Sequence, residues 1–299
     1  MSTPVCYFNG RWIAADEIAI SPDDLGFLLG ATVTERLRTF AGQPFRVAEH
    51  VARLRHSLEV VGWRAERLAA EVEGAIGQFV ARNAALIAPG DDWAIVAFVT
   101  PGVTYDAAQP TVCVHGFPLR FAGWAHQFAA GVAGVVVDVR QVPGNCWPAE
   151  LKCRSRMHYY LADQEAARKQ PGARAILLDQ HGYVCEASTA NVVAYFADRG
   201  LVTPKLDGVL PGISQQVLFE LADGLGMTHG EADLTPEELA AANEAFLTST
   251  SICMLPLVQL DGRPIGTGAA GPVFQNLLQA WSKLVGLDIG GQAVERSTG

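Results

Sequence analysis

The sequence lacks the features that define several large classes of protein. Positive charge is scarce, because 22 lysine and arginine residues stand against 31 aspartate and glutamate residues, which gives a formal net charge of −9 at pH 7. A field of that sign repels nucleic acid and anionic membrane surfaces. The most apolar run, residues 132–139, is far shorter than the ~20 residues that cross a bilayer, and residues 1–10 do not resemble a signal peptide. We therefore predict a cytoplasmic protein with neither a nucleic-acid nor a membrane partner.

Motifs for metals, disulfides and several enzyme classes are also missing. The six cysteines are scattered without a CxxC pair, which fits a reducing compartment, and the seven histidines form no HExxH motif. There is no GxxxxGK[ST] phosphate loop, no GxGxxG after a strand and no GxSxG elbow. These absences argue against a metal enzyme and against a serine hydrolase, and we predict no metal ligand.

Lysine is rarer than arginine, since only four of the 22 cationic residues are lysines: Lys152, Lys169, Lys205 and Lys283. An amine can lose its proton when it is desolvated and can form a Schiff base, whereas a guanidinium cannot. Lys169 and Lys283 lie late in predicted helices, and Lys205 lies in a predicted loop. Lys152 stands at a predicted helix start. Composition by itself still favours a surface cation there, so a catalytic Lys152 needs further support.

Length and hydrophobic periodicity predict two mixed domains. The 299 residues, 49% of them hydrophobic, suffice for two domains or one large one. In the first part we expect a hairpin at 5–14 turning at Asn9-Gly10, a strand pair within 32–47, helices at 49–61 and 64–84, and strands at 93–100 and 111–117. In the second part we expect a strand at 131–139, a helix at 153–168, a hairpin at 173–196, a helix at 213–225, a strand at 245–248, a helix at 272–285 and a frayed end at 290–299. This pattern predicts a small N-terminal α/β domain at 1–120, a linker at 121–131 and a larger C-terminal domain at 132–299.

Four other features have both a functional and an ordinary interpretation. Glu186 ends a predicted strand and is either a surface charge or a buried acid that holds a partner. The run 210–214, Leu-Pro-Gly-Ile-Ser, opens a helix whose exposed N–H groups can hold an anion, or it is an ordinary Pro-Gly turn. The four hydroxyl residues 248–251 can form a phosphate-binding turn. Arg53 lies on an amphipathic helix and points either inward at an anion or outward at water.

Five segments, in this order, resemble the fold-type IV, or class IV, pyridoxal-phosphate (PLP) enzymes: residues 25–54, 150–166, 177–193, 209–222 and 244–272. Among them are the runs VTERLRTF, ELKCRSR, VCEASTAN, LPGIS and TSTS. The family includes branched-chain and D-amino-acid aminotransferases, (R)-amine transaminases and aminodeoxychorismate lyases. The resemblance implies a two-domain α/β (α+β) fold with PLP between a small N-terminal domain and a larger C-terminal domain that carries the Schiff-base lysine.

The resemblance also implies roles for single residues. Lys152 matches the catalytic lysine that binds PLP covalently and moves the proton, and Glu186 matches the acid that pairs with the pyridine nitrogen. Arg53 matches the arginine that holds the cofactor phosphate. The remaining implied phosphate contacts are Ile213, Ser214 and Thr250.

The substrate residues match no single subgroup. Thr34 stands where many members have Tyr or Phe, Arg38 matches an arginine of branched-chain aminotransferases, and Trp93 lies near the place of a substrate-contacting tyrosine. Residues 104–108 lack the Arg-x-His that D-amino-acid aminotransferases use for the substrate carboxylate, and residues 153–156 replace a Gly-Gly-Asn-Tyr run. Either backbone amides near Ser251 hold that carboxylate, or the substrate has none.

We therefore expect an enzyme that moves the amino group of a hydrophobic, branched-chain-like L-amino acid to a 2-oxo acid such as 2-oxoglutarate. An aminodeoxychorismate-type lyase and an (R)-amine or D-amino-acid transaminase are alternatives, and a PLP-binding homologue without turnover is a remote one. The resemblance further implies a homodimer. Its small-molecule partners would be an amino donor and a keto-acid acceptor.

Overall fold

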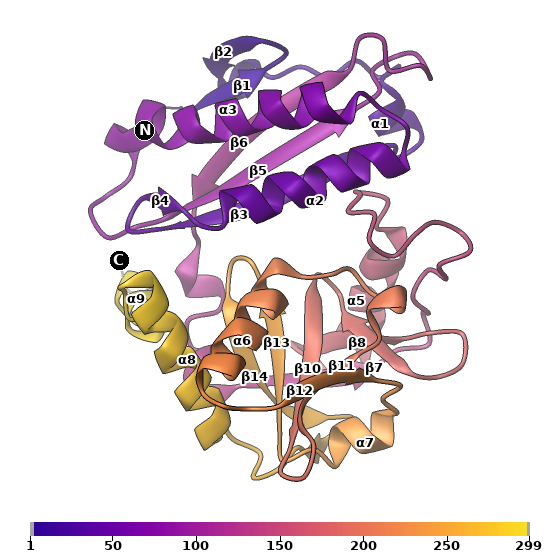
Figure 1. Cartoon of the computed structure of the whole chain (residues 1–299), viewed down its shortest axis with the longest axis vertical. Coiled ribbons are helices and arrows are strands. Elements are labelled where there is room, and N and C mark those ends of the chain that lie inside the picture. The colour runs from indigo at the N-terminus through magenta and orange to yellow at the C-terminus, as the bar shows by residue number, and fades with distance from the viewer. Residues whose placement is uncertain (1–2, 298–299) are drawn as a thin grey trace. The chain divides into compact units, whose positions relative to one another are not determined.

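The computed structural model describes residues 3–297, and the chain forms two compact units (Figure 1). The first unit extends to Leu119 and also includes Leu151–Ser155, and the second contains Arg120–Glu150 and the chain from Arg156 onward. The predicted division differs in two places. Residues 151–155, expected in the larger domain, belong to the first unit because they pair with one of its strands, and the expected linker 121–131 belongs to the second unit.

The first unit is built on a six-stranded antiparallel sheet in the order β2-β1-β6-β5-β3-β4. Its strands are β1 (Val5–Phe8), β2 (Arg11–Ala14), β3 (Val33–Phe40), β4 (Gln43–Pro44), β5 (Trp93–Thr100) and β6 (Thr111–Pro118). Its helices are α1 (Leu25–Leu28), α2 (Val47–Val60) and α3 (Ala65–Asn83). The expected strands and helices of this part are therefore confirmed.

Helices α2 and α3 cover one face of this sheet (Figure 1). Val51, Leu54 and Leu58 recur at helical spacing along α2 and are buried against the sheet. Because side chains alternate along a strand, the residues of β3, β5 and β6 that enter this core are every second one. The intervening residues lie on the other face of the sheet.

The second unit is built on a nine-stranded mixed sheet in the order β12-β11-β10-β13-β14-β7-β8-β9, with β15 paired to β14. Its strands are β7 (Val132–Val136), β8 (Arg174–Leu178), β9 (Val184–Ala187), β10 (Ala190–Phe196), β11 (Gly200–Pro204), β12 (His229–Ala232), β13 (Glu244–Ser249), β14 (Cys253–Leu260) and β15 (Arg263–Pro264). Strand β9, at the end of this order, also pairs with β10. The strands from β10 round to β9 therefore close on themselves.

Up to residue 297, where the described part of the second unit ends, its α-helices are α4 (Gln127–Ala130), α5 (Met157–Lys169), α6 (Ile213–Gly224), α7 (Pro236–Ala240), α8 (Pro272–Val285) and α9 (Ile289–Ser297). The helix expected from residue 153 begins only at Met157, and Cys153 instead forms a β-bridge with Val33. The expectation of a frayed end is wrong for residues 290–297, which form most of α9, and residues 298–299 lie outside the described part. Among residues 3–297, no helix has the length and apolar character needed to cross a membrane.

Candidate active site

Lys152 is held at the edge of the first unit's sheet by its backbone. Its carbonyl accepts a hydrogen bond of 3.0 Å from the N–H of Thr34, and the N–H of Arg154 donates to the carbonyl of Thr32 at 2.9 Å. The N–H of Lys152 itself donates to the hydroxyl of Ser57 on α2 at 3.2 Å. This short extended segment is therefore fixed to β3 and to α2 from two sides.

The other three lysines have different surroundings. The ammonium of Lys169 pairs with Glu165 at 2.6 Å and donates to a backbone carbonyl, and Lys205 pairs with Asp233 at the surface. Lys283 lies in the last turn of α8, where a cation favours the helix dipole. Each of these three has an ordinary structural explanation.

Arg53 points inward and forms a two-point ion pair with a buried carboxylate. Its Nε and Nη2 atoms donate to the two oxygens of Glu35, at 2.8 Å and 2.9 Å. His50, one turn earlier on α2, lies 2.8 Å from Glu35 through Nδ1. Glu35 is completely buried, so its two oxygens fix the plane of the Arg53 guanidinium.

Arg53, Glu35 and His50 form a buried trio. Burial and the charge of Arg53 determine the pKa values of Glu35 and His50. Burial raises the pKa of Glu35, but the charge and hydrogen bonds of Arg53 and the hydrogen bond to His50 outweigh it and hold that pKa well below its usual range. Burial lowers the pKa of His50, and the nearby charges of Arg53 and Lys152 lower it further against the opposing effect of Glu35. Sequence reasoning missed Glu35 and His50, because nothing in their spacing shows that β3 and α2 bring them together.

The three predicted substrate residues of the first unit are placed differently from one another. Thr34 is buried, donates through Oγ1 to the carbonyl of Ala97 at 2.8 Å and accepts from the Nε of Arg154 at 3.4 Å. Arg38 is also buried, pairs with Asp92 at 3.4 Å and stacks over the ring of Phe40. Trp93 is 1% exposed and lies in the core beneath α3, with its ring against Phe79. Because Trp93 is buried in that core, its side chain packs against other core residues.

Glu186 lies on β9 of the second unit and is 4% exposed. Its Oε1 atom accepts short hydrogen bonds from the hydroxyl of Tyr159 and the amide of Gln141. Burial, with the charge of Glu186 added, raises the pKa of Tyr159 well above its usual value, so this hydroxyl remains a donor. Glu186 is therefore a buried and oriented acid, and neither of its two partners was predicted from the sequence.

The strand register places Glu186 in a row with two polar side chains. Asn191 on β10 is directly opposite both Glu186 on β9 and Thr248 on β13. Directly paired residues lie on the same face of a sheet, so the three side chains share one face. The Oγ1 atom of Thr248 is buried and, within the described part of the chain, has no hydrogen-bond partner. Such an atom favours a site for a polar ligand.

The beginning of helix α6 is fixed against the same row. The amide of Asn191 donates to the carbonyl of Leu210 at 2.8 Å, and a Cβ atom on Gly212 would lie 2.0 Å from the Asn191 Oδ1. No side chain caps this helix at its N-cap residue, Gly212, whereas the carboxylate of Glu244 accepts from the first N–H groups of α8. Ile213 and Ser214 form the first turn of α6, and exposed N–H groups at such a position bind anions.

Thr250 and Ser251 lie in the turn that connects β13 to β14, both half-buried. The turn follows Ser249, the residue after Thr248, and leads into Cys253, which adopts a left-handed conformation with a φ of 61°. The second unit thus groups Glu186, the start of α6 and the hydroxyls of this turn around one end of its sheet.

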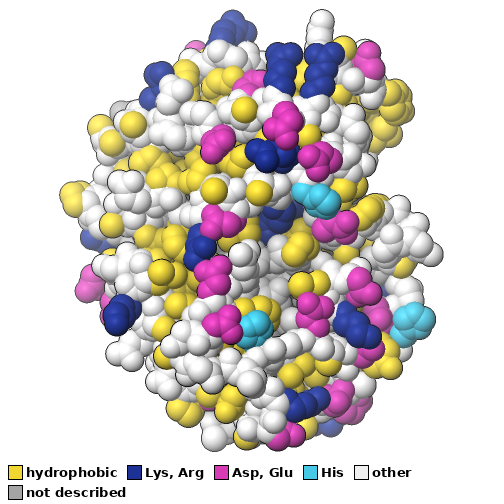
Figure 2. Space-filling view, in the orientation of Figure 1, with side chains coloured by type: hydrophobic (Ala, Val, Ile, Leu, Met, Phe, Trp, Pro, Cys, Tyr) yellow, Lys and Arg dark blue, Asp and Glu magenta, His cyan; other side chains and the backbone are white. Residues whose placement is uncertain are grey.

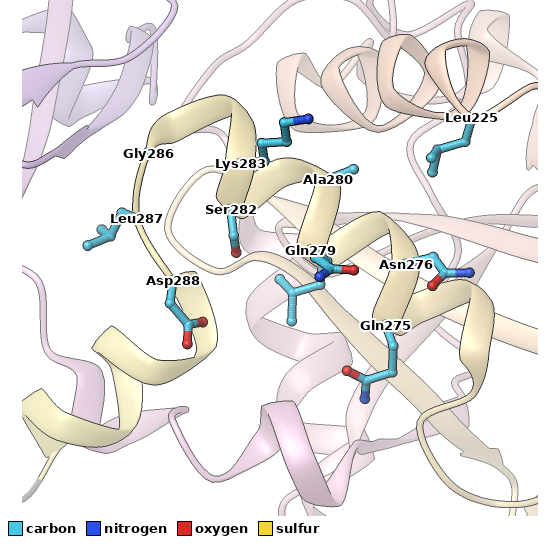
Figure 3. Close-up of a pocket in the computed structure, with 11 residues that line it drawn as sticks. Leu225, Gln275, Asn276, Gln279, Ala280, Ser282, Lys283, Gly286, Leu287 and Asp288 are labelled. Atoms are coloured by element: carbon cyan, nitrogen blue, oxygen red, sulfur yellow. The ribbon is translucent and has the colours of Figure 1, made fainter.

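A separate hollow of about 1000 Å³ lies along helix α8 of the second unit (Figure 3). Its walls include Leu225, Gln279, Lys283 and Asp288, so the charged groups are one amine and one carboxylate. None of the predicted site residues lines it. The hollow therefore does not belong to the candidate active site.

Residues 32–260 match the family model of the class IV aminotransferases, which covers more than half of the chain. The chain therefore belongs to this family of PLP-dependent aminotransferases. It is 28% identical over 282 residues to the D-alanine aminotransferase of Bacillus licheniformis, an alignment that covers 91% of this chain and 94% of the relative. It is 26% identical over 281 residues to the branched-chain-amino-acid aminotransferase of Escherichia coli (strain K12), covering 92% and 91%.

Solved structures show the same fold. The branched-chain amino acid aminotransferase of T.th. with pyridoxamine 5′-phosphate superposes with a TM-score of 0.83 at 24% identity, covering 96% of this chain and 95% of that one. The expected two-domain, fold-type IV architecture is confirmed by this match.

Proposed function

We propose that this aminotransferase moves the amino group of a hydrophobic, branched-chain-like L-amino acid to a 2-oxo acid such as 2-oxoglutarate, with PLP bound covalently by Lys152. The observation that carries the cofactor assignment is the oriented, buried Glu186 beside the uncapped start of α6. The sequence relation to branched-chain aminotransferases supports the substrate assignment.

The residues present fit PLP. The buried Thr248 hydroxyl without a partner and the uncapped α6 start suit a phosphate, as do the α6 residues Ile213 and Ser214 and the turn residue Thr250. In the first unit, the guanidinium of Arg53, oriented by Glu35, suits an anionic group such as a phosphate. The Glu186 carboxylate would accept a hydrogen bond from the protonated pyridine nitrogen.

When bound, PLP supplies an electron sink that makes the proton on the substrate Cα acidic. After the amino donor has displaced Lys152 from the cofactor, the freed Lys152 amine would take that proton through Nζ and later deliver it to the cofactor, which an amine can do and an arginine cannot. Tyr159 and Gln141 donate to Glu186 and fix the direction of its carboxylate, which would face the pyridine nitrogen. In the second unit, the first turn of α6 would hold the phosphate end of the cofactor.

The first experiment is a half-reaction on the full chain loaded with PLP, with L-leucine and D-alanine offered separately. We expect L-leucine to convert the cofactor to its pyridoxamine form, as seen by loss of the absorbance of the lysine-bound cofactor. Conversion by D-alanine alone would contradict the L-amino-acid assignment. D-Amino-acid transamination is the second candidate function, because a D-alanine aminotransferase is among the relatives.

A substitution tests the role of Lys152 separately. Lys152→Ala should lower turnover by about 10²- to 10⁴-fold, the usual contribution of a positioned acid–base group. Lys283→Ala, which changes a surface lysine at the end of α8, is the matched control and should retain turnover. A Lys152→Ala protein with wild-type turnover would refute the assignment.

We also propose that the enzyme is a homodimer. In the first unit, α1 and the loop after β5 expose large apolar side chains, with Phe27 74% exposed and Tyr105 80% exposed. The N–H of Leu25 donates to the carbonyl of Gly102 at 2.8 Å, so α1 and this loop are joined. A second copy of the chain would remove this surface from water.

A further inference from the structure

A cluster of basic side chains lies on the face of the first unit's sheet that α2 and α3 do not cover. Leu37, Ile95 and Val114 point into the helix-covered core, so their neighbours in sequence point to the other face. The strand register aligns Arg36 on β3, Val96 on β5 and His115 on β6 as one row across that face. Arg36 and His115 therefore flank Val96.

Arg154 adds a second guanidinium to this face. Its Nε donates to Thr34 Oγ1 at 3.4 Å, and its guanidinium carbon lies 5.1 Å from the centre of the Phe98 ring. The Phe98 ring also contacts His115, with 6.1 Å between ring centres. Arg154 and His115 thus both contact Phe98, while the guanidinium of Arg36 lies over the Phe117 ring, 5.4 Å from its centre, on the same face of the sheet.

The charges in this cluster favour an anion. Burial lowers the pKa of His115 to about 4, and the positive charges of Arg154 and Arg36 contribute to the shift. At neutral pH the ring is therefore uncharged and still has one N–H to donate. The guanidiniums of Arg36 and Arg154 both lie close enough to His115 to affect its pKa. A carboxylate bound between them would offset their positive charges, and arginine binds carboxylates through parallel hydrogen bonds.

The cluster lies beside the catalytic lysine in the chain and in the fold. Arg154 follows Lys152 by two residues, and alternation along an extended segment puts residues i and i+2 on the same face. Thr34 joins the two, because its N–H donates to the Lys152 carbonyl and its hydroxyl accepts from Arg154. A small substrate that reacts at Lys152 is therefore within reach of this face.

We propose that Arg36, Arg154 and His115 bind the carboxylate of the substrate, with Val96 and Phe98 against its apolar part. The inference rests on the proposed function and names its substrate class, which is carboxylate-bearing amino acids and 2-oxo acids rather than simple amines. It also supplies a carboxylate site for a chain that lacks Arg-x-His in residues 104–108.

The test measures binding of an unreactive acid as well as turnover. The full chain loaded with PLP is titrated with 4-methylvalerate, and with the uncharged amide of the same acid, by calorimetry. We expect Arg154→Gln and Arg36→Gln each to raise the Kd of the acid about tenfold and to remove the preference for the acid over the amide. In steady-state kinetics the KM for L-leucine should rise more than kcat falls.

Arg82→Gln is the matched control, because Arg82 is an exposed arginine of the same unit that also lies over an aromatic ring, that of Trp12. It should leave the Kd of the acid unchanged. If a Gln variant fails to fold, Arg154→Lys and Arg36→Lys replace it in the test. These two variants keep the positive charge and should retain part of the affinity for the acid. An unchanged Kd in folded Arg154→Gln and Arg36→Gln proteins would overturn the inference.

Failure of this inference differs from failure of the proposed function. If the wild type transaminates L-leucine and the Gln variants bind the acid equally well, the inference is wrong and the function stands. If the wild type binds the acid through these arginines but converts no amino donor, the carboxylate site stands and the proposed transamination is wrong.

Discussion

Glu35 holds the buried side chains of Arg53 and His50 together in the first unit. It receives two hydrogen bonds from Arg53 and one contact from His50, all inside the protein. Removing one partner of a buried ion pair leaves the other charge without compensation. Glu35 therefore orients the Arg53 guanidinium, and under the proposed function it would act on a phosphate only through Arg53.

Glu35→Gln should lower the free energy of unfolding by about 3–5 kcal/mol, the usual cost of breaking a buried pair. It should also weaken PLP binding, as Arg53 loses its fixed orientation. Urea denaturation and a PLP titration followed by absorbance measure the two effects. Glu73→Gln, an exposed residue of α3, is the control and should change neither. Unchanged stability in Glu35→Gln would contradict the role given to the trio.

The same trio predicts how stability depends on pH. The pKa of Glu35 is lower in the folded state than its ordinary value, so its contribution is present above that value, near ~4.3, and is lost as the pH falls toward the folded pKa. The pKa of His50 is also lowered, so the unfolded chain binds more protons below pH ~6.5. Both effects lower stability on acidification. Urea denaturation of the wild type between pH 7 and pH 4 should show a monotonic loss, and a maximum near pH 4 would contradict it.

Which way Arg53 points shows the limit of sequence reasoning for a single residue. The helical pattern of α2 locates Arg53 on the helix, but it leaves the inward and outward orientations open. Glu35 decides between them from a strand 18 residues earlier in the chain. The contacts of Tyr159 and Gln141 with Glu186 could not be predicted for the same reason. They join segments that are far apart in the sequence, and local residue spacing carries no information about such contacts.

Periodicity predicted most elements, and the exceptions have physical causes. Residues 153–156 were expected to start a helix, but pairing of Cys153 with Val33 keeps this segment extended, because tertiary contacts override weak local preference. Helix α9 was missed because two glycines and polar residues suggest a loose end. Ile289 and Ala293 are nevertheless buried, and packing rather than propensity stabilises such a short helix.

The start of α6 depends on a glycine at residue 212. Gly212→Ala would place a Cβ atom 2.0 Å from the Asn191 Oδ1, which must move, together with its hydrogen bond to Leu210. We expect a loss of about 1–3 kcal/mol, as for other overpacked sites, and weaker PLP binding. Thermal denaturation and a PLP titration measure these changes.

Gly224→Ala, at the other end of α6, is the matched control, because its added Cβ meets no atom within 4 Å. It should be neutral or slightly stabilising, since alanine has the higher helix propensity. Equal behaviour of the two variants would show that the contact with Asn191 does not matter.

Charge and exposed apolar surface describe the molecule as a whole. On the face drawn in Figure 2, Lys and Arg side chains are interspersed with Asp and Glu rather than gathered into one basic area. The formal net charge of −9 repels nucleic acid, which carries charge of the same sign. The exposed apolar residues of α1 and the loop after β5 suit a protein partner better.

The homodimer proposal predicts a change in mass. Light scattering should give twice the chain mass of 31.9 kDa for the wild type, and the double variant Phe27→Asp with Tyr105→Asp should shift toward the single chain. Leu284→Asp, which places a charge at a 49% exposed apolar position of α8, is the control and should remain dimeric. A wild type that is fully active as a single chain would refute the proposal.

The chain enters the first unit a second time for residues 151–155 only. The return of residues 151–155 to the first unit affects the recombination of genes of this family. A crossover near residue 119 would take β3 from one parent and the lysine segment that completes its edge from the other. Functional hybrids should therefore be more frequent when the two stretches are inherited together, so the unit of exchange is a discontinuous block of the gene rather than its first two-fifths.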